Sequence, residues 1–252
     1  MFSAILKKEP VQYEMMKYEG VIFDLDGVIC HTDEFHYQAW KSLADTLEIY
    51  FDKQINNRLR GVSRMESLEI ILERYDGKPL SKSEKVRLSE DKNDLYKSLL
   101  MKMDESYLSE KVKNTLKTLR DHGVKLAIGS SSKNADLILN RIGLGRFFDA
   151  VSDGNNIQFS KPHPQVFLLA AEYISLPPSK CLVVEDARAG IEAAAAGGFD
   201  SAGIGDAAGD ERATYHISEL DEILAIVFNQ NSGGRNNATD AVFKGETVLS
   251  NR

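Results

Sequence analysis

The sequence predicts an α/β protein: a Rossmann-like core with a parallel sheet, and a helical cap domain inserted after the first strand. Two observations support this prediction. From Val112 to Ile204, short apolar segments alternate with segments of helical periodicity, and such alternation implies right-handed crossovers and a parallel sheet. An earlier apolar strand, near Val21, is separated from this alternation by a block of helical pattern at residues 33–103.

The first strand lies in the run Val-Ile-Phe-Asp-Leu-Asp-Gly-Val at residues 21–28. Its carboxyl end delivers Asp24 and Asp26 to an edge of the sheet, and side chains at i and i+2 leave a strand on the same side. Gly27 then allows a sharp turn. Two adjacent carboxylates need a cation or a shared proton, and oxygen ligands favour Mg²⁺. The alternative for a lone Asp-x-Asp pair is a strand that ends in a polar loop.

The inserted block reads as three helices. The first two have apolar residues at helical spacing, before and after a break at residues 60–63, and the third covers residues 82–103 after the turn at Gly77-Lys78-Pro79. The apolar positions are Phe35, Ala39, Trp40, Leu43 and Leu47, and then Leu68, Ile71, Leu72 and Tyr75.

The rest of the core follows in order. A helix from Val112 ends at His122-Gly123, after which we expect strands at 124–129, 148–152, 181–184 and 201–204 and helices at 133–142, 164–173 and 187–196. We therefore expect an N-terminal extension at 1–18, a core at 19–32 and 104–228, a cap at 33–103, and a polar C-terminal tail at 229–252.

Composition limits the partners and the compartment. The net charge of −7 argues against a nucleic-acid or anionic-membrane surface, although a few local cations can still hold an anionic substrate. Two cysteines, Cys30 and Cys181, form no disulfide framework and indicate a reducing compartment. No apolar run approaches the roughly 18 residues of a membrane span, and the N-terminal segment lacks the apolar core of a signal peptide. We expect a cytoplasmic monomer with no nucleic-acid or membrane partner.

Parallel folds place their ligands at the carboxyl ends of strands, and polar residues follow three more strands. The run from Ser130 to Lys133 offers hydroxyls and backbone amides that suit a phosphate, although such serines also serve as helix N-caps. Lys161, beside Pro162, can neutralise a phosphoryl oxygen as a point charge; a lone lysine is more often solvated, so its position carries the inference. The pair Glu185-Asp186 would complete a Mg²⁺ site with Asp24.

This ordered set resembles the haloacid dehalogenase-like superfamily of phosphotransferases. Its four motifs stand here as Asp24-Leu25-Asp26-Gly27, Ser130, Lys161 and Glu185-Asp186, in family order at the ends of predicted strands. Within the superfamily, residues 19–228 resemble the β-phosphoglucomutase family. The further residues that carry this likeness are Thr32, His36, Trp40, Gly61-Val62-Ser63-Arg64, Lys92-Asn93-Asp94 and Ser132-Lys133-Asn134.

The resemblance implies roles in the core. Asp24 would be the nucleophile that becomes an aspartyl phosphate, and Asp26 the general acid/base. Mg²⁺ would meet the carboxylates of Asp24, Glu185 and Asp186 and the backbone carbonyl of Asp26. Ser130 and Lys161 would hold the transferring phosphoryl group and balance its charge.

The resemblance also implies roles in the cap. Gly61, Val62, Ser63 and Arg64 would form the substrate-specificity loop, where the planar fork of Arg64 grips the phosphate that is not being transferred. Lys92 would assist, and Ser132, Lys133 and Asn134 would also bind substrate. His36 would couple closure of the cap to substrate binding; the alternative is a histidine with a packing role. Trp40 is expected in the core of the cap.

The implied activity is a Mg²⁺-dependent interconversion of β-D-glucose 1-phosphate and β-D-glucose 6-phosphate through glucose 1,6-bisphosphate, with small-molecule sugar phosphates as partners. Two departures from the family pattern stand out: Arg60 replaces a lysine, and Ala187 replaces a serine. A sugar-phosphate phosphatase of the same fold, in which water discharges Asp24, is the first alternative. A non-catalytic regulator that binds sugar phosphates is the second.

Overall fold

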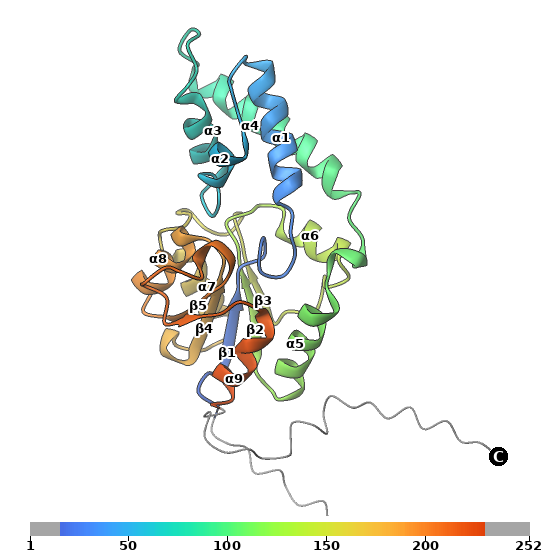
Figure 1. Cartoon of the computed structure of the whole chain (residues 1–252), viewed down its shortest axis with the longest axis vertical. Helices are drawn as coiled ribbons and strands as arrows, with labels where there is room; N and C mark the ends of the chain where they lie inside the picture. The colour runs from blue at the N-terminus through green and yellow to red at the C-terminus, as the bar shows by residue number, and fades with distance from the viewer. Residues whose placement is uncertain (1–15, 230–252) are drawn as a thin grey trace, which may run out of the picture.

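A parallel sheet forms the core of the computed structural model, which describes residues 16–229 (Figure 1). Its strand order is β3-β2-β1-β4-β5-β6, and every neighbouring pair is parallel. The strands are β1 (Gly20–Phe23), β2 (Lys125–Gly129), β3 (Ala150–Ser152), β4 (Cys181–Glu185), β5 (Asp200–Gly203) and β6 (Tyr215–His216). The predicted α/β class is confirmed.

Helices α1 to α4 lie between β1 and β2 in the chain and gather beyond the carboxyl ends of the strands (Figure 1). We call residues 33–103 the cap; its boundaries stay a prediction. The helices are α1 (Asp33–Thr46), α2 (Lys53–Asn57), α3 (Arg64–Leu72), α4 (Lys82–Leu100), α5 (Glu110–Asp121), α6 (Ala135–Arg141), α7 (Gln165–Tyr173), α8 (Arg188–Ala196) and α9 (Ile223–Val227). The cap has its own apolar cluster, which includes Trp40, Leu43 and Leu68.

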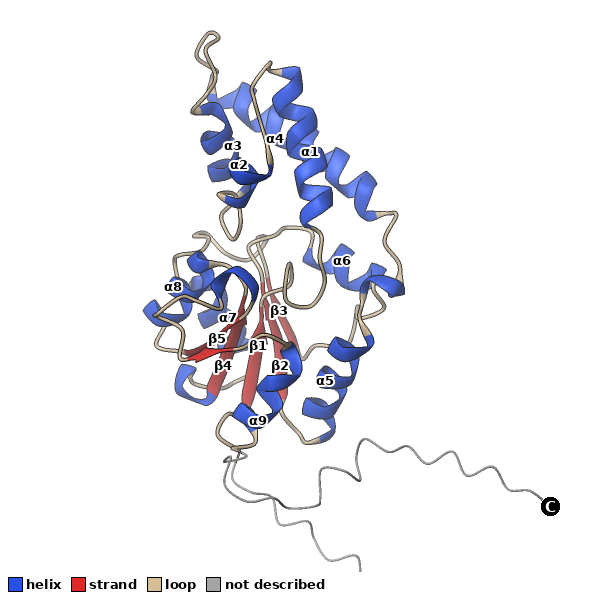
Figure 2. Ribbon diagram, in the orientation of Figure 1, coloured by secondary structure: helices blue, strands red, loops and turns tan. Residues whose placement is uncertain are grey.

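The strands are buried on both faces, as the unbroken apolar runs predict. Val21 and Phe23 of β1 join one apolar cluster, with α5 and α6, while Ile22 joins a second one, with α7 and α8. Figure 2 shows α5 along one side of the strands and α7 with α8 along the other. Because both faces are covered, the carboxyl edge of the sheet under the cap is left as the place for a site.

The predicted helices and strands of the core are found, with boundaries shifted by one or two residues. Among the α-helices and strands, three short elements were missed: α2, β6 and α9. The expectations for the two ends of the chain fall mainly on residues 1–15 and 230–252, outside the described residues. Within residues 16–229, no helix combines the length and the apolar character needed to cross a membrane.

Candidate active site

Three buried carboxylates meet at the carboxyl edge of the sheet. Asp24 follows β1, Glu185 ends β4 and Asp186 comes next, and each offers an oxygen within 4.8 Å of the others. The Asp24 N–H donates to the carbonyl of Val184 at 2.9 Å, so pairing of β1 with β4 sets the distance between the acids. Sequence analysis placed the metal site in these three carboxylates and the backbone carbonyl of Asp26.

Lys161 lies inside this group and is fully buried. Its Nζ donates to Asp24 Oδ1 at 2.5 Å and to Glu185 Oε2 at 2.7 Å. Glu185 Oε1 accepts the backbone N–H groups of Asp186 at 3.1 Å and Ala187 at 2.9 Å, which orients the carboxylate. Burial disfavours the charged lysine, but the two carboxylates prevail and raise the pKa of Lys161. Lys161 is therefore a fixed cation beside Asp24.

Negative charge nevertheless remains in excess. Burial raises the pKa of Asp24 to about 8, with Lys161 opposing this and Glu185 adding repulsion. Burial, followed by repulsion from Glu185 and Asp24, raises the pKa of Asp186 to about 9. A cluster of carboxylate oxygens with unbalanced charge fits a hard divalent cation such as Mg²⁺.

The side chain of Asp26 does not belong to the group of three carboxylates. It accepts a hydrogen bond from the Thr32 hydroxyl, which in turn accepts one from the Tyr96 hydroxyl at 3.0 Å. Burial raises the pKa of Asp26 to about 6, near the range that suits proton transfer at neutral pH. Gly27, which directly follows Asp26, has φ of 96°. A Cβ at this position would stand 2.0 Å from Asp186 Oδ2. Only glycine fits this turn.

The serine loop after β2 is shaped by its own hydroxyls. Ser130 Oγ accepts the N–H of Ser132 at 3.2 Å, and Ser132 Oγ accepts the N–H of Asn134 at 3.2 Å. Asn134 occupies the N-cap position of α6, without a side-chain capping bond. The serines therefore hold the loop rather than cap the helix, which weakens the N-cap interpretation.

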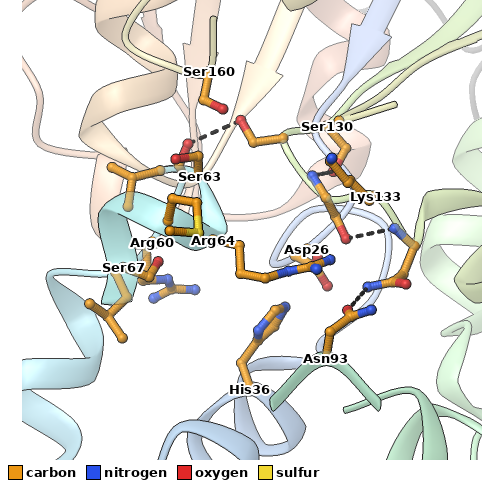
Figure 3. Close-up of a pocket in the computed structure, with 18 of the residues that line it drawn as sticks. Asp26, His36, Arg60, Ser63, Arg64, Ser67, Asn93, Ser130, Lys133 and Ser160 are labelled. Atoms are coloured by element: carbon orange, nitrogen blue, oxygen red, sulfur yellow. Dashed lines mark hydrogen bonds between the residues drawn. The ribbon is translucent and has the colours of Figure 1, made fainter. Parts of the chain in front are cut away.

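A cavity of about 480 Å³ lies between the core and the cap. Residues from both parts point into it (Figure 3). The predicted site residues that line it are Asp24, Asp26, His36, Gly61, Val62, Ser63, Arg64, Lys92, Ser130, Ser132, Lys133, Asn134, Glu185 and Asp186. Lys161 is not among them, because it lies behind Asp24 and Glu185.

The cap end of the cavity carries two basic side chains, Arg64 and Lys92, and one acidic side chain, Glu90. Arg64, the first residue of α3, extends from the cap toward Asp26 (Figure 3). Among residues 16–229 no carboxylate lies within ion-pair distance of it. Lys92 on α4 is buried, and its Nζ lies 3.0 Å from His36 Nδ1. Burial lowers the pKa of Lys92 to about 7.

His36 and Trp40 combine packing with a place in the cavity. The His36 ring stacks on Tyr96 with centroids 4.0 Å apart, and burial followed by the charge of Lys92 lowers the pKa of His36 well below its ordinary value. Trp40 belongs to the apolar cluster of the cap, as expected, and also lines the cavity. Its ring centroid lies 4.4 Å from Lys92 Nζ.

Several contacts that join the cap to the core were not anticipated, although the sequence analysis had singled out the residues that make them. Asn134 Nδ2 donates to Asn93 Oδ1 at 2.9 Å, and Ser131 Oγ donates to the carbonyl of Gly61 at 3.1 Å. Arg60, noted only as a departure from the family pattern, contacts Asp186 at 2.7 Å. The cavity-lining Asn56, Ser67 and Ser89 were also missed, since no local pattern separates them from other polar helix residues.

The model of the haloacid dehalogenase-like hydrolase family matches residues 18–198. The chain belongs to this family. It is 39% identical over 189 residues to the β-phosphoglucomutase of Bacillus subtilis (strain 168), covering 74% of this chain and 83% of the relative. It is also 32% identical over 191 residues to the fructose-1-phosphate phosphatase YqaB of Escherichia coli (strain K12), covering 73% of this chain and 95% of the relative.

The chain is also similar to the crystal structure of β-phosphoglucomutase from Clostridium difficile. The TM-score is 0.78 at 34% sequence identity, covering 84% of this chain and 98% of the other. The resemblance noted from the sequence is thus confirmed at the level of the family and its relatives. Because both a mutase and a phosphatase are among these relatives, the family alone leaves the reaction open.

Proposed function

We propose that the protein is a β-phosphoglucomutase, which interconverts β-D-glucose 1-phosphate and β-D-glucose 6-phosphate through an aspartyl phosphate and glucose 1,6-bisphosphate. One observation carries the choice: Asp24 and the basic side chains of Arg64 and Lys92 line the same cavity. A bisphosphate that must bind in two orientations needs a second anion-binding end. The similarity to a relative named β-phosphoglucomutase supports the same choice.

The proposed chemistry begins at Asp24. Its carboxylate attacks one phosphorus of glucose 1,6-bisphosphate, the bond from that phosphorus to the sugar oxygen breaks, and Asp26 gives the oxygen a proton, which leaves a sugar monophosphate and the aspartyl phosphate. In the opposite transfer, Asp26 removes the proton from the free 6-hydroxyl of β-glucose 1-phosphate, and that oxygen attacks the aspartyl phosphate, which forms glucose 1,6-bisphosphate and frees Asp24. The raised pKa of Asp26, about 6, lets it serve as both acid and base. The chain would be a phosphoprotein during turnover.

The other residues would bind the phosphate groups of the substrate and neutralise their charge. Ser130 would hold the transferring phosphoryl group, Lys161 would balance its charge from behind Asp24, and Arg64, Lys92 and the Ser132–Asn134 segment would hold the distal phosphate. His36 would couple closure of the cap to substrate binding. Asp24, Glu185, Asp186 and the Asp26 carbonyl would bind Mg²⁺, which supplies charge neutralisation for phosphoryl transfer when it is bound.

A sugar-phosphate phosphatase is the second candidate, favoured by the similarity to a fructose-1-phosphate phosphatase. In that reaction water would discharge Asp24. A regulator without catalysis is less well supported, because each motif residue is present. We further propose a monomeric cytoplasmic enzyme with the cap at residues 33–103.

The test is a coupled assay with β-glucose 1-phosphate, Mg²⁺ and a trace of glucose 1,6-bisphosphate, following glucose 6-phosphate and inorganic phosphate together. A mutase forms glucose 6-phosphate with little phosphate release; phosphate release without isomerisation identifies a phosphatase. Asp24→Ala is expected to abolish either reaction. Arg64→Ala is expected to lose isomerisation while phosphoryl transfer to Asp24 is partly retained, and equal loss of both would contradict the role of the cap.

A further inference from the structure

Arg60 joins the cap to two loops of the core. It lies in the cap loop between α2 and α3, and its guanidinium contacts carboxylates from three different elements (Figure 3 labels its position). Nη2 lies 2.7 Å from Asp186 Oδ2 and 2.9 Å from Asp33 Oδ2, and Nη1 lies 2.7 Å from Asp206 Oδ2. Asp186 follows β4, Asp206 lies in the short helical turn after β5, and Asp33 begins α1.

The same loop is held on its other side by the neighbouring residue. The carbonyl of Gly61 accepts the Ser131 hydroxyl at 3.1 Å, from the loop after β2. Gly61 has φ of 75°, and a Cβ there would lie 3.4 Å from Ala187 Cβ. Both departures from the family pattern, Arg60 and Ala187, therefore lie where the cap loop touches the core. Residues 60 and 61 bridge the rim of the cavity, from the β4 and β5 side to the β2 side.

We propose that Arg60 is a positioning residue that latches the cap loop onto the core and couples its closure to the charge of the acidic cluster. A planar guanidinium can direct Nη1 to Asp206 and Nη2 to Asp186 at once, whereas an ammonium is a single point charge on a flexible stem. The side chain is 23% exposed, so these bonds are only partly screened. The latch acts on the loop whichever phosphoryl acceptor the enzyme uses.

The shared carboxylate gives the latch a second effect. Arg60 places a positive charge on Asp186, a member of the three-carboxylate group that fits Mg²⁺. Removing that charge makes the cluster more negative, so Mg²⁺ should bind more tightly to a protein whose loop is less well held. A residue with only a packing role would change neither property in this way.

The first experiment measures hydrogen–deuterium exchange of the backbone amides of residues 59–63 in the full chain with saturating Mg²⁺ and no substrate. Arg60→Lys keeps the charge but loses the fork, and Asp206→Asn removes the exposed core anchor. Each variant is expected to raise exchange about fivefold, and the double variant no further, because both break one contact. Arg58→Lys is the matched control, since Arg58 pairs with Glu73 within the cap at 2.7 Å; it should leave exchange unchanged. Any other pattern overturns the latch.

The second experiment titrates Mg²⁺ alone by calorimetry. Arg60→Ala is expected to lower the Kd for Mg²⁺ about tenfold, from the loss of one unit charge next to a divalent site, and Arg58→Ala to leave it unchanged. An unchanged or raised Kd in Arg60→Ala overturns the coupling. Neither readout requires turnover, so failure of the latch and failure of the proposed reaction are distinguishable.

Discussion

Lys92→Met is expected to stabilise the protein while weakening its binding of sugar phosphate. Lys92 is 4% exposed, and burial followed by repulsion from Arg64 lowers its pKa to about 7, with Asp26 opposing. Its ammonium is therefore held in a poor environment until an anion reaches it. Methionine has a similar length and no charge, so it removes this penalty and also removes the cation that would meet a phosphate.

The size of the expected stabilisation follows from the lowered pKa of Lys92. A fall from 10.5 to about 7 corresponds to roughly 5 kcal/mol, since one pKa unit is about 1.4 kcal/mol. Two lost interactions offset part of this gain. The ammonium lies 4.4 Å from the Trp40 ring centroid, an interaction of about 1 kcal/mol, and 3.0 Å from His36 Nδ1, another 1 kcal/mol or so. The expected gain in the free energy of unfolding at pH 7 is about 2–3 kcal/mol.

The gain depends on pH with a definite sign. Between pH 7 and 10.5 the unfolded chain holds more protons at Lys92 than the folded one, so wild-type stability rises with pH across this window. The methionine variant lacks that rise, and its advantage should shrink towards pH 10. Urea unfolding followed by circular dichroism at pH 7 and pH 10 measures both values.

Lys97→Met is the matched control on the same helix. Its side chain is 49% exposed and lies 3.5 Å from Asp94, so the change should stay within about 0.5 kcal/mol. The reasoning is refuted if Lys92→Met is no more stable than wild type at pH 7, or if its advantage is the same at both pH values.

Three further outcomes are expected. Mg²⁺ at 100 times its Kd should raise the free energy of unfolding by about 2.7 kcal/mol; equal melting temperatures in Mg²⁺ and in EDTA would contradict the metal site at Asp24 and Asp186. Gly27→Ala should weaken Mg²⁺ binding at least about tenfold by displacing Asp186, whereas Gly123→Ala, also at positive φ but with nothing within 4 Å, should leave Mg²⁺ titrations unchanged. Asp26→Asn should lower kcat by about 10²–10⁴ with Mg²⁺ affinity retained, and a matching loss of affinity would argue against a separate acid/base role.

The placing of the acidic residues could be predicted because it depends on local pattern and strand direction. A buried run that ends in Asp24, and another that ends in Glu185, must bring their carboxyl ends to one edge if the sheet is parallel. The sheet order places β1 beside β4, so the acids at the ends of these two strands lie close together. The sequence did not indicate that Lys161 would lie behind these acids, fully buried, because burial of a lysine depends on partners far away in the chain.

The missed features share a different cause. α2 has five residues and β6 two, too few for periodicity to distinguish them, and short helices are stabilised by tertiary packing rather than by propensity. The contacts of Arg60 with Asp186 and Asp206 span 126 and 146 residues. A single sequence contains no signal for such distant pairs, and even the family resemblance indicated only that residue 60 should be cationic.

The two ends of the cavity carry titratable groups of opposite type, and burial shifts the pKa of each towards the neutral form. Burial raises the pKa of Asp24 to about 8 and lowers that of Lys92 to about 7, so an anion bound beside Lys92 favours its charged form. A phosphate dianion at the cap should therefore raise the pKa of Lys92, and at pH 8 the protein should take up close to one proton per sugar phosphate bound. Calorimetry in Hepes and in Tris measures this uptake from the different ionisation enthalpies of the buffers. Lys92→Met should abolish the uptake, and identical binding enthalpies in both buffers for the wild type would mean that Lys92 does not meet the phosphate.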